Sequence, residues 1–386
     1  MRTLFPDYRS TWETEDHGIL RKHAAEFFAK EVTPHQERWA SQHQVDRDLW
    51  RKAGDAGLLG LDIGDEYGGG GGHFGHEAVV LQELAFAQDT AFGFNIHSTI
   101  SAHYLAAFGT DDQKMRWLPQ VTSGGAVLAI AMTEPGTGSD LQSIRTTAIR
   151  DGDHYIVNGS KTFISNGSHC DLLIVVAKTD PDLGAKGISL LVVEVADLPG
   201  FERGRLLEKL GQHGQDTREL FFSEMRVPAA NLLGGVEGEG FAQLMRQLPR
   251  ERLSIAISGV AMAEAAVIAT LDYVKDRTVF GSRVLDFQNT QFVLSECKAE
   301  LLAGKAMVDH CIERYIGGTL DTATASMAKL WGSDKQCEII DRCLQLFGGY
   351  GYCMEYPIAR MYAAARVQKI YGGTNEIMKT LIARTL

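Results

Sequence analysis

The sequence predicts an α+β protein in which a helical region, a β region and a second helical region follow one another. Apolar residues recur at spacings of three and four over residues 13–120 and again from residue 237 onward, which is the period of helices packed on one face. Between residues 126 and 230, short apolar or alternating runs are separated by Gly, Asn, Asp and Pro, as in antiparallel strands. Because helices and strands do not alternate, we expect separate domains at 1–124, 125–235 and 236–386.

The N-terminal region contains four helical patterns. They are EDHGILRKHAAEFFAKEV (15–32), HFGHEAVVLQELAF (73–86), FNIHSTISAHYLAAFG (94–109) and DDQKMRWLPQV (111–121). The glycine run at 68–72 lacks the Lys-Ser or Lys-Thr of a phosphate loop, so we interpret it as a flexible connection between helices. His73 and His76 lie beside Glu77, but no third ligand follows at a suitable spacing, and no metal site is predicted.

The middle and C-terminal regions also contain a series of predicted elements. The middle region holds five predicted strands, in AVLAIAM (126–132), HYIVNG (154–159), DLLIVVAKTD (171–180), GISLLVVEV (187–195) and LFFSEMRVP (220–228). The C-terminal region holds helical patterns over 238–275, 286–315, 320–347 and 356–368, with a short one after Gly373.

Composition limits the class of protein. A net charge of −11 argues against nucleic acid as the main partner, because phosphate binding needs a basic face. The six cysteines form no CxxC pair, which favours free thiols in a reducing compartment over a zinc site or disulfides. No apolar run approaches 18 residues and the N-terminus does not resemble a signal peptide. We therefore expect a cytoplasmic protein without a membrane span.

One charged residue stands out in the apolar pattern that opens the C-terminal region. On a helix that starts near Phe241, Glu251 shares a face with four apolar residues, which are Leu244, Leu248, Ile255 and Met262. A buried carboxylate must either pair with a cation or raise its pKa. From the residues alone, Glu251 is either half of a structural ion pair or a general base facing an apolar pocket.

Small, hydroxylated and aromatic residues gather in five further segments. They are AMTEPGTGSD (131–140), SKTFISNG (160–167), DRTVFGSRVLDFQNTQ (276–291), LFGGYGY (346–352) and YGGTNEI (371–377). Hydroxyls and exposed amides in the first segment could bind a planar, oxygen-rich ligand or phosphate, although a plain β-turn has the same composition. In the second, a strand would place Phe163 and Ser165 on one face, where the ring could stack on a ligand or pack in the core. Paired glycines alone are weak evidence of a site.

Taken together and in this order, these segments resemble the acyl-CoA dehydrogenase family, nearest its long-chain and isovaleryl branches. The resemblance implies the acyl-CoA dehydrogenase fold, with an N-terminal helical domain, a middle β domain and a C-terminal four-helix bundle, assembled as a homotetramer. It also implies FAD between the β domain and the C-terminal helices. The implied reaction removes an α-proton and a β-hydride from an acyl-CoA to give the trans-2-enoyl-CoA, and an electron-transfer flavoprotein accepts the electrons.

The resemblance also implies roles for individual residues. Met132, Thr133, Gly138 and Ser139 match flavin contacts, and Ser139 also lies near the substrate. Phe163 stands where many relatives have Trp, and Ser165 where some have Thr. The remaining predicted FAD contacts are Arg277, Phe280 and Gln288, which reach the FAD of a neighbouring subunit, Gln345, Leu346, Phe347, Gly348 and Gly349, and Thr374 and Glu376. The predicted substrate contacts besides Ser139 are Leu248, Arg252, Tyr371, Gly372 and Gly373.

The sequence departs from the commonest family pattern at one position. Many members carry the catalytic glutamate directly after the tyrosine of the last motif, and that position is Gly372 here. The long-chain and isovaleryl branches instead place the base in a Glu-Arg pair on the helix that opens the C-terminal domain. Glu251 and Arg252 match that pair. The resemblance therefore favours Glu251 as the base. A flavin oxidase on the same fold and a non-catalytic acyl-CoA-binding protein remain the alternatives.

Overall fold

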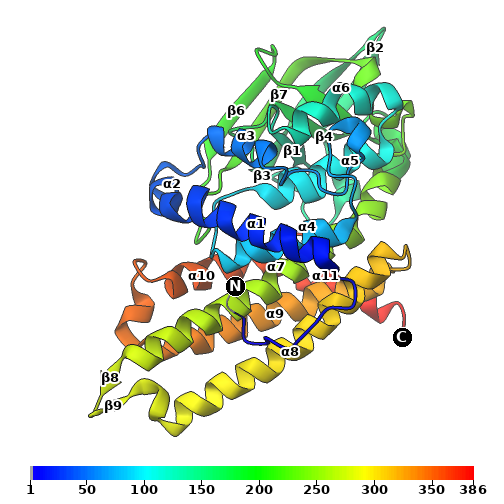
Figure 1. Cartoon of the computed structure of the whole chain (residues 1–386). Coiled ribbons are helices and arrows are strands. Elements are labelled where there is room, and N and C mark those ends of the chain that lie inside the picture. The colour runs from blue at the N-terminus through cyan, green and yellow to red at the C-terminus, as the bar shows by residue number, and fades with distance from the viewer. Residues whose placement is uncertain (1–2) are drawn as a thin grey trace.

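The computed structural model describes residues 3–386, and it separates into the three predicted regions. In Figure 1 the N-terminal helices and the β domain occupy the upper half of the molecule, and the long C-terminal helices lie side by side below them. Helix α4 (Phe74–Phe86) packs on α7 (Gly240–Asp276) where the two halves meet. The predicted boundaries fall between elements: α6 ends at Thr122 before the first strand, and α7 begins at Gly240.

The N-terminal region is helical throughout, as predicted. Besides two short 3-10 helices, η1 (Thr33–His35) and η2 (Asp65–Tyr67), its remaining elements are α1 (Glu15–Glu31), α2 (Gln36–Gln42), α3 (Asp48–Asp55), the π-helical segment η3 (Asn95–Ser101), α5 (Ala102–Phe108) and α6 (Asp111–Thr122). The prediction of a flexible glycine loop needs correction, because the backbone N–H of each glycine from 68 to 72 donates a hydrogen bond to a carbonyl within 60–65. A Cβ on Gly69 would lie 2.3 Å from the Ile63 carbonyl oxygen, so the close approach requires glycine there.

The middle region is a seven-stranded sheet. Its strands are β1 (Leu128–Ala131), β2 (Thr147–Asp151), β3 (His154–Ser165), β4 (Leu172–Lys178), β5 (Ile188–Glu194), β6 (Phe201–Leu206) and β7 (Thr217–Pro228). The order is β1-β4-β2-β3-β7-β6, and β5 pairs with β4. Expecting a purely antiparallel domain was wrong, because β4 runs parallel to both β1 and β2. Residues 172–177 are all buried, as both faces of β4 are covered. The uninterrupted apolar run LLIVVA is typical of such a strand.

The C-terminal region is built on α7, whose 37 residues are the longest helix of the described chain. It packs along α9 (Thr322–Leu346) and α8 (Gln288–Ile316), while α10 (Pro357–Ala365) and α11 (Asn375–Ala383) cover α9. A short hairpin, β8 (Thr278–Val279) and β9 (Ser282–Arg283), extends from the far end of α7 (Figure 1). Within residues 3–386, α7 is the one helix long and apolar enough to cross a membrane, but 83% of its most apolar window is buried inside the fold, which is ordinary for a central core helix.

Candidate active site

Glu251 lies in the fourth turn of α7 and is buried, with 6% of its surface exposed. Its apolar neighbours on the same face, Leu244, Ile255 and Met262, are also buried, and Leu248 is half-buried. The carboxylate accepts one hydrogen bond, at 2.7 Å, from the hydroxyl of Tyr104 on α5. This tyrosine is completely buried.

The surroundings of Glu251 disfavour its charged form. Burial raises the pKa of Glu251 above its ordinary value, while the Tyr104 hydrogen bond and the charge of Arg252 offset part of the rise. No cation bonds the carboxylate directly among residues 3–386, so a structural ion pair does not describe it. A buried carboxyl with a raised pKa and a single hydroxyl partner is suited to exchanging a proton with a ligand.

Arg252 connects α7 to the loop that carries the last glycine motif. Its Nε donates a hydrogen bond of 3.4 Å to the carbonyl of Gly372, and the side chain is 4% exposed. Gly372 and Gly373 both have positive φ, +63° and +89°, a conformation that favours glycine. A Cβ on Gly372 would lie 2.4 Å from Cδ1 of Ile255, one turn after Glu251. The loop therefore approaches α7 closely because residue 372 has no side chain.

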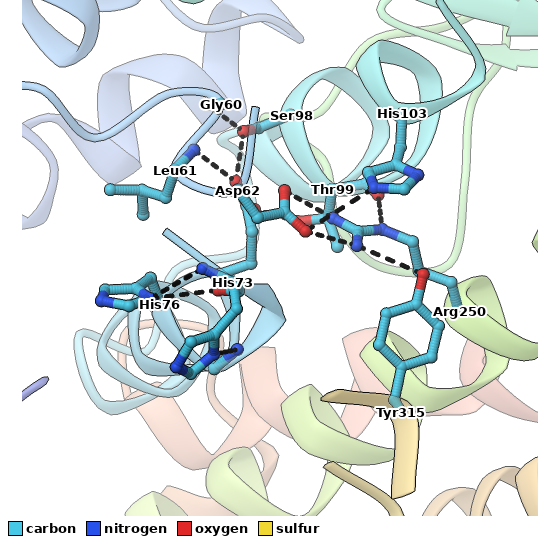
Figure 2. A network of polar contacts seen from close by, with 12 residues as sticks. Gly60, Leu61, Asp62, His73, His76, Ser98, Thr99, His103, Arg250 and Tyr315 are labelled. Carbon is cyan, nitrogen blue, oxygen red and sulfur yellow. Dashed lines mark hydrogen bonds and ion pairs between the residues drawn. The ribbon is translucent and has the colours of Figure 1, made fainter. Parts of the chain in front are cut away.

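Arg250, on the other side of Glu251, belongs to a separate network (Figure 2). Its guanidinium forms two hydrogen bonds with Asp62, at 2.6 and 3.0 Å, and its Nε donates to the Thr99 carbonyl at 2.6 Å. The rings of Phe74 and Tyr315 lie against it, with centroids at 4.8 and 5.7 Å. Arg250 thus fastens the start of α7 to η3 and to the loop after α3.

Glu77 of α4 extends this network. Its carboxylate accepts hydrogen bonds from the hydroxyls of Ser98 and Thr99 and from the backbone N–H of Leu61. Burial, followed by the charge of Asp62, raises the pKa of Glu77 to about 7. Every partner in this group is a protein group, so the network can hold the N-terminal domain against α7 without a ligand.

A pocket of about 110 Å³ lies between α4, α7, α10 and the end of β3. Ser165, Tyr371, Ser258 and Met262 line it, together with the segment 92–96 that follows α4. The amide oxygens of Gln336 and Gln368, also on its wall, are buried with no hydrogen-bond partner in the described chain. The pocket thus joins the β domain to α7 and the last glycine motif, and its polar wall can receive a ligand with hydrogen-bonding groups.

A second pocket, of about 370 Å³, lies where α7 ends beside the motif that follows α9. Arg277, Leu346, Phe347, Gly348 and Gly349 line it, all five of them predicted cofactor contacts. The ring of Phe347 stacks on Tyr273 with centroids 4.2 Å apart. A Cβ on Gly348 or Gly349 would meet no atom within 4 Å, so the backbone here is open to a ligand.

The comparisons with known proteins agree with this geometry. Three family profiles match the chain in order: the N-terminal, middle and C-terminal domains of acyl-CoA dehydrogenase, over residues 14–125, 129–225 and 238–386. A long-chain specific mitochondrial acyl-CoA dehydrogenase from Sus scrofa is 47% identical over 97% of this chain and 87% of its own length. The chain belongs to the acyl-CoA dehydrogenase family.

Solved structures place the chain in the same family. An acyl-CoA dehydrogenase from Geobacillus kaustophilus superposes with a TM-score of 0.95 at 46% identity, covering 98% of this chain and 99% of the other. A glutaryl-CoA dehydrogenase from Mycobacterium smegmatis, in complex with FADH2, superposes with a TM-score of 0.90 at 27% identity, covering 97% and 95%. This protein is accordingly an FAD-dependent oxidoreductase that acts on CH–CH donors.

The residues of the β domain are compatible with a bound flavin. Phe163 is 67% exposed and has a φ of +60°, because β3 is irregular between Lys161 and Ile164. The regular strand expected there was wrong, and core packing of Phe163 is excluded, since the bulge turns its ring outward. Met132 and Thr133 follow β1 and are half-buried, while Gly138 and Ser139 are exposed. An exposed aromatic ring beside small and hydroxylated residues is what a stacked isoalloxazine needs.

Other predicted contacts do not meet within one copy of the chain. Phe280, at the tip of the β8–β9 hairpin, is 97% exposed, and Gln288 and Gln345 are exposed as well. Thr374 caps α11 by accepting the N–H of Ile377, and Glu376 is exposed in its first turn. The roles of these residues stay predictions.

The sequence indicated only two of the three histidines that cluster in the structure. His17 of α1 joins His73 and His76, so that three imidazoles can place ligand atoms within 4.8 Å of one another. However, each Nδ1 is within hydrogen-bonding distance of a backbone N–H: those of Thr14, Gly75 and His73 for His17, His73 and His76 respectively. A neutral imidazole that accepts at Nδ1 carries its proton on Nε2 and has no lone pair left for a metal. The group therefore caps two helices, and the absence of a metal site remains a prediction.

Proposed function

We propose that this chain catalyses the α,β-desaturation of a fatty acyl-CoA to the trans-2-enoyl-CoA, with Glu251 removing the α-proton. The observation that carries the proposal is the pairing of a buried, raised-pKa carboxyl at 251 with a glycine at 372, where many relatives carry the base. Arg252 and Ile255 contact the glycine loop from the same face of α7 that holds Glu251. We therefore expect the carboxylate of Glu251 to reach a substrate bound beside this loop.

The protein's own groups supply proton removal, charge stabilisation and exclusion of water. The α-proton of a thioester is too weakly acidic for an unaided carboxylate, so the negative charge at the thioester oxygen must be stabilised. We assign part of this task to the backbone N–H of Gly372. Burial of Glu251 raises its pKa and brings it nearer to that of the proton it takes. FAD, when bound, supplies the acceptor for the hydride that leaves the β-carbon.

The similarity to long-chain enzymes supports a long acyl chain. A long-chain specific acyl-CoA dehydrogenase from Sus scrofa is 47% identical to this chain. Met262 of α7, which lines the pocket of about 110 Å³, offers an apolar surface on which an alkyl chain can pack.

We further propose an electron-transfer flavoprotein as the acceptor and a homotetramer as the assembly. The nearly complete exposure of Phe280, on a hairpin that projects from the bundle, supports a neighbouring subunit that covers it. Aromatic side chains such as this one are enriched at protein–protein interfaces. A cytoplasmic location stays a prediction.

The decisive experiment compares Glu251→Gln with Glu264→Gln. Both residues are buried on α7, but Glu264 binds Thr3 and Leu4 at the N-terminus. Turnover would be measured with acyl-CoAs from four to eighteen carbons, using an electron-transfer flavoprotein and, separately, oxygen as acceptor. We expect Glu251→Gln to keep FAD and lose activity by a factor of about 10² to 10⁴, while Glu264→Gln stays active.

Two results would contradict the proposal. Near-normal turnover by Glu251→Gln would remove this residue from the role of base. Rapid peroxide formation with oxygen, and no transfer to the flavoprotein, would identify an oxidase instead. An optimum at the shortest chains would contradict only the assignment of a long acyl chain.

A further inference from the structure

A buried lysine outside the predicted site holds the glycine loop. Lys329 of α9 is fully buried, and its Nζ donates hydrogen bonds to the Gly373 carbonyl at 2.7 Å and to Oδ1 of Asn375 at 2.9 Å. The amide of Asn375 in turn donates to Ser333 and Asp334. Lys329 therefore fixes residues 373–375 to the body of the bundle.

Among residues 3–386, no carboxylate bonds the ammonium of Lys329. Both of its hydrogen-bond partners are neutral, and Asp334 is reached only through Asn375 and already pairs with Lys369 at 2.6 Å. The other fully buried lysine, Lys161, bonds Glu134 directly at 3.0 Å. Burying a cation beside neutral groups costs stability, and a neutral donor could make the same bonds. The retained charge therefore calls for a functional explanation.

The ammonium nevertheless keeps its proton at neutral pH. Burial, followed by the nearby charge of Arg252, lowers the pKa of Lys329 to about 8. Two cations thus lie behind the same loop: Arg252 on the carbonyl of Gly372 and Lys329 on the carbonyl of Gly373.

The opposite side of these peptide groups is free. The peptide units whose carbonyls Arg252 and Lys329 hold carry the N–H groups of Gly373 and Thr374, and within residues 3–386 these two groups have no hydrogen-bond partner. The N–H of Gly372, in the preceding peptide unit, has none either. In a trans peptide the N–H points away from the C=O of the same unit, and a cation on the carbonyl polarises the N–H at the other end. Consecutive free N–H groups of this kind form a concavity that favours an anion.

We propose that Lys329 is a positioning residue for anion stabilisation in this active site. With Arg252 it holds the carbonyls of residues 372 and 373, keeps the loop's N–H groups available to the thioester oxygen, and supplies positive charge where the substrate becomes negative. The inference rests on the proposed function, because it needs a substrate whose α-proton is removed at this place.

The test separates removal of the α-proton from the rest of the reaction. A 3-thia-acyl-CoA can lose its α-proton, but the sulfur at position 3 has no hydride to give. Its anion is detected by the long-wavelength absorbance that an electron-rich ligand produces beside an oxidised flavin, and titration gives the pKa of the bound analogue. FAD content and thermal unfolding report structural damage independently.

Four variants distinguish charge from hydrogen bonding. Lys329→Gln keeps a donor without charge, Lys329→Met removes both, and Lys329→Arg keeps the charge. Lys335→Met is the matched control, because Lys335 lies on the same helix in surface pairs with Glu300 and Glu338. We expect the pKa of the bound analogue to rise by about one unit or more, a tenfold loss of anion, in Lys329→Gln and Lys329→Met. Lys329→Arg and Lys335→Met should stay near the parent value.

Three outcomes would overturn the inference. FAD-loaded Lys329→Gln with an unchanged analogue pKa would show that the charge is dispensable. An equal shift in Lys335→Met would show a general effect of net charge. If the parent protein binds the analogue but never ionises it, the proposed function itself is contradicted, and the role of Lys329 falls with it.

Discussion

The two arginines that flank Glu251 face different environments. Arg250 and Arg252 are two residues apart on α7, so their side chains diverge by about 200°. Arg250 forms a bidentate ion pair with Asp62 and is covered by two aromatic rings. Arg252 makes one long hydrogen bond, at 3.4 Å, to a backbone carbonyl beside two glycines.

This difference separates a structural charge from a functional one. A buried ion pair with complete hydrogen bonding can hold elements together, and nothing further is required of it. Arg252 and Lys329 lack such a partner, and both lie against the loop that borders the proposed substrate space. All three cations are buried, so burial does not distinguish them. The difference is that a carboxylate neutralises Arg250, whereas none in the described chain is bonded to Arg252 or Lys329.

The largest expected effect is a loss of stability when the ion pair between Arg250 and Asp62 is broken. Asp62→Asn leaves the guanidinium of Arg250 buried without its bonded carboxylate, which should lower the free energy of unfolding by about 3–5 kcal/mol. Chemical denaturation of the FAD-loaded protein measures this change. The double variant Arg250→Leu with Asp62→Leu removes both charges, and we expect it to be clearly more stable than Asp62→Asn.

A functional role for the pair would give a different result. If the double variant kept its stability but lost the ionisation of a bound 3-thia-acyl-CoA, Arg250 would contribute to the chemistry. The distinction between the two arginines would then be wrong.

A smaller effect is expected at the hydroxyl that binds Glu251. The Tyr104 hydrogen bond favours the charged carboxylate, so Tyr104→Phe should raise the pKa of Glu251 further. We expect the acid limb of kcat/KM to move to higher pH by about one unit, since a hydrogen bond to a charged group contributes about 1.5 kcal/mol or more. Tyr155→Phe is the matched control, because Tyr155 is also buried and donates to a carboxylate, Glu237, in the β domain. An unchanged pH profile would mean that Tyr104 only fills space.

The repeating pattern of the sequence predicted most of the fold. The order of helical and β regions, and a helix in each of the nine predicted helical segments, follow from local periodicity, whereas β2 and β6 were not among the five predicted strands. The direction of β4 was missed, although its unbroken apolar run indicated burial on both faces. The bulge at Phe163 could not be foreseen, because it depends on how β3 pairs with β7.

The site was predictable only in part. Glu251 could be singled out because a charge interrupts an apolar helix face, and the glycine motifs could be matched to a family. Tyr104 and Lys329 could not, since each meets its partner across a long stretch of chain, 147 residues for Tyr104 and Glu251 and 44 for Lys329 and Gly373. Likewise, His17 completes the histidine group from a different helix. Only tertiary packing identifies such partners.

The smallest expected effect is a gradual fall of kcat/KM in mild acid. Burial raises the pKa of Glu251, so kcat/KM should fall by at most tenfold per pH unit as this carboxylate takes up a proton at a pH above its ordinary 4.5. Burial also opposes the charge of Asp62, but Arg250 and His103 outweigh it and hold its pKa below the ordinary 3.8. The stability that Asp62 contributes is therefore complete above pH 3.8 and is lost only as pH falls through its lowered pKa.

Buried histidines also make the free energy of unfolding depend on pH. The pKa values of His17 and His97 are lowered to about 4, chiefly by burial, so the stability they contribute is complete above 6.5 and declines as pH falls toward 4. This decline is common to the parent and to Asp62→Asn, so the difference in their unfolding free energies cancels it. The charge of Asp62 helps raise the pKa of Glu77 to about 7, so protonation of Glu77 as pH falls from 7 to 5 should stabilise the parent more than Asp62→Asn. We therefore expect that difference to widen over this range, while kcat/KM of the parent falls only on its acid limb. A difference that shrinks in step with activity would mean that Glu251 and the Arg250–Asp62 pair titrate as one unit.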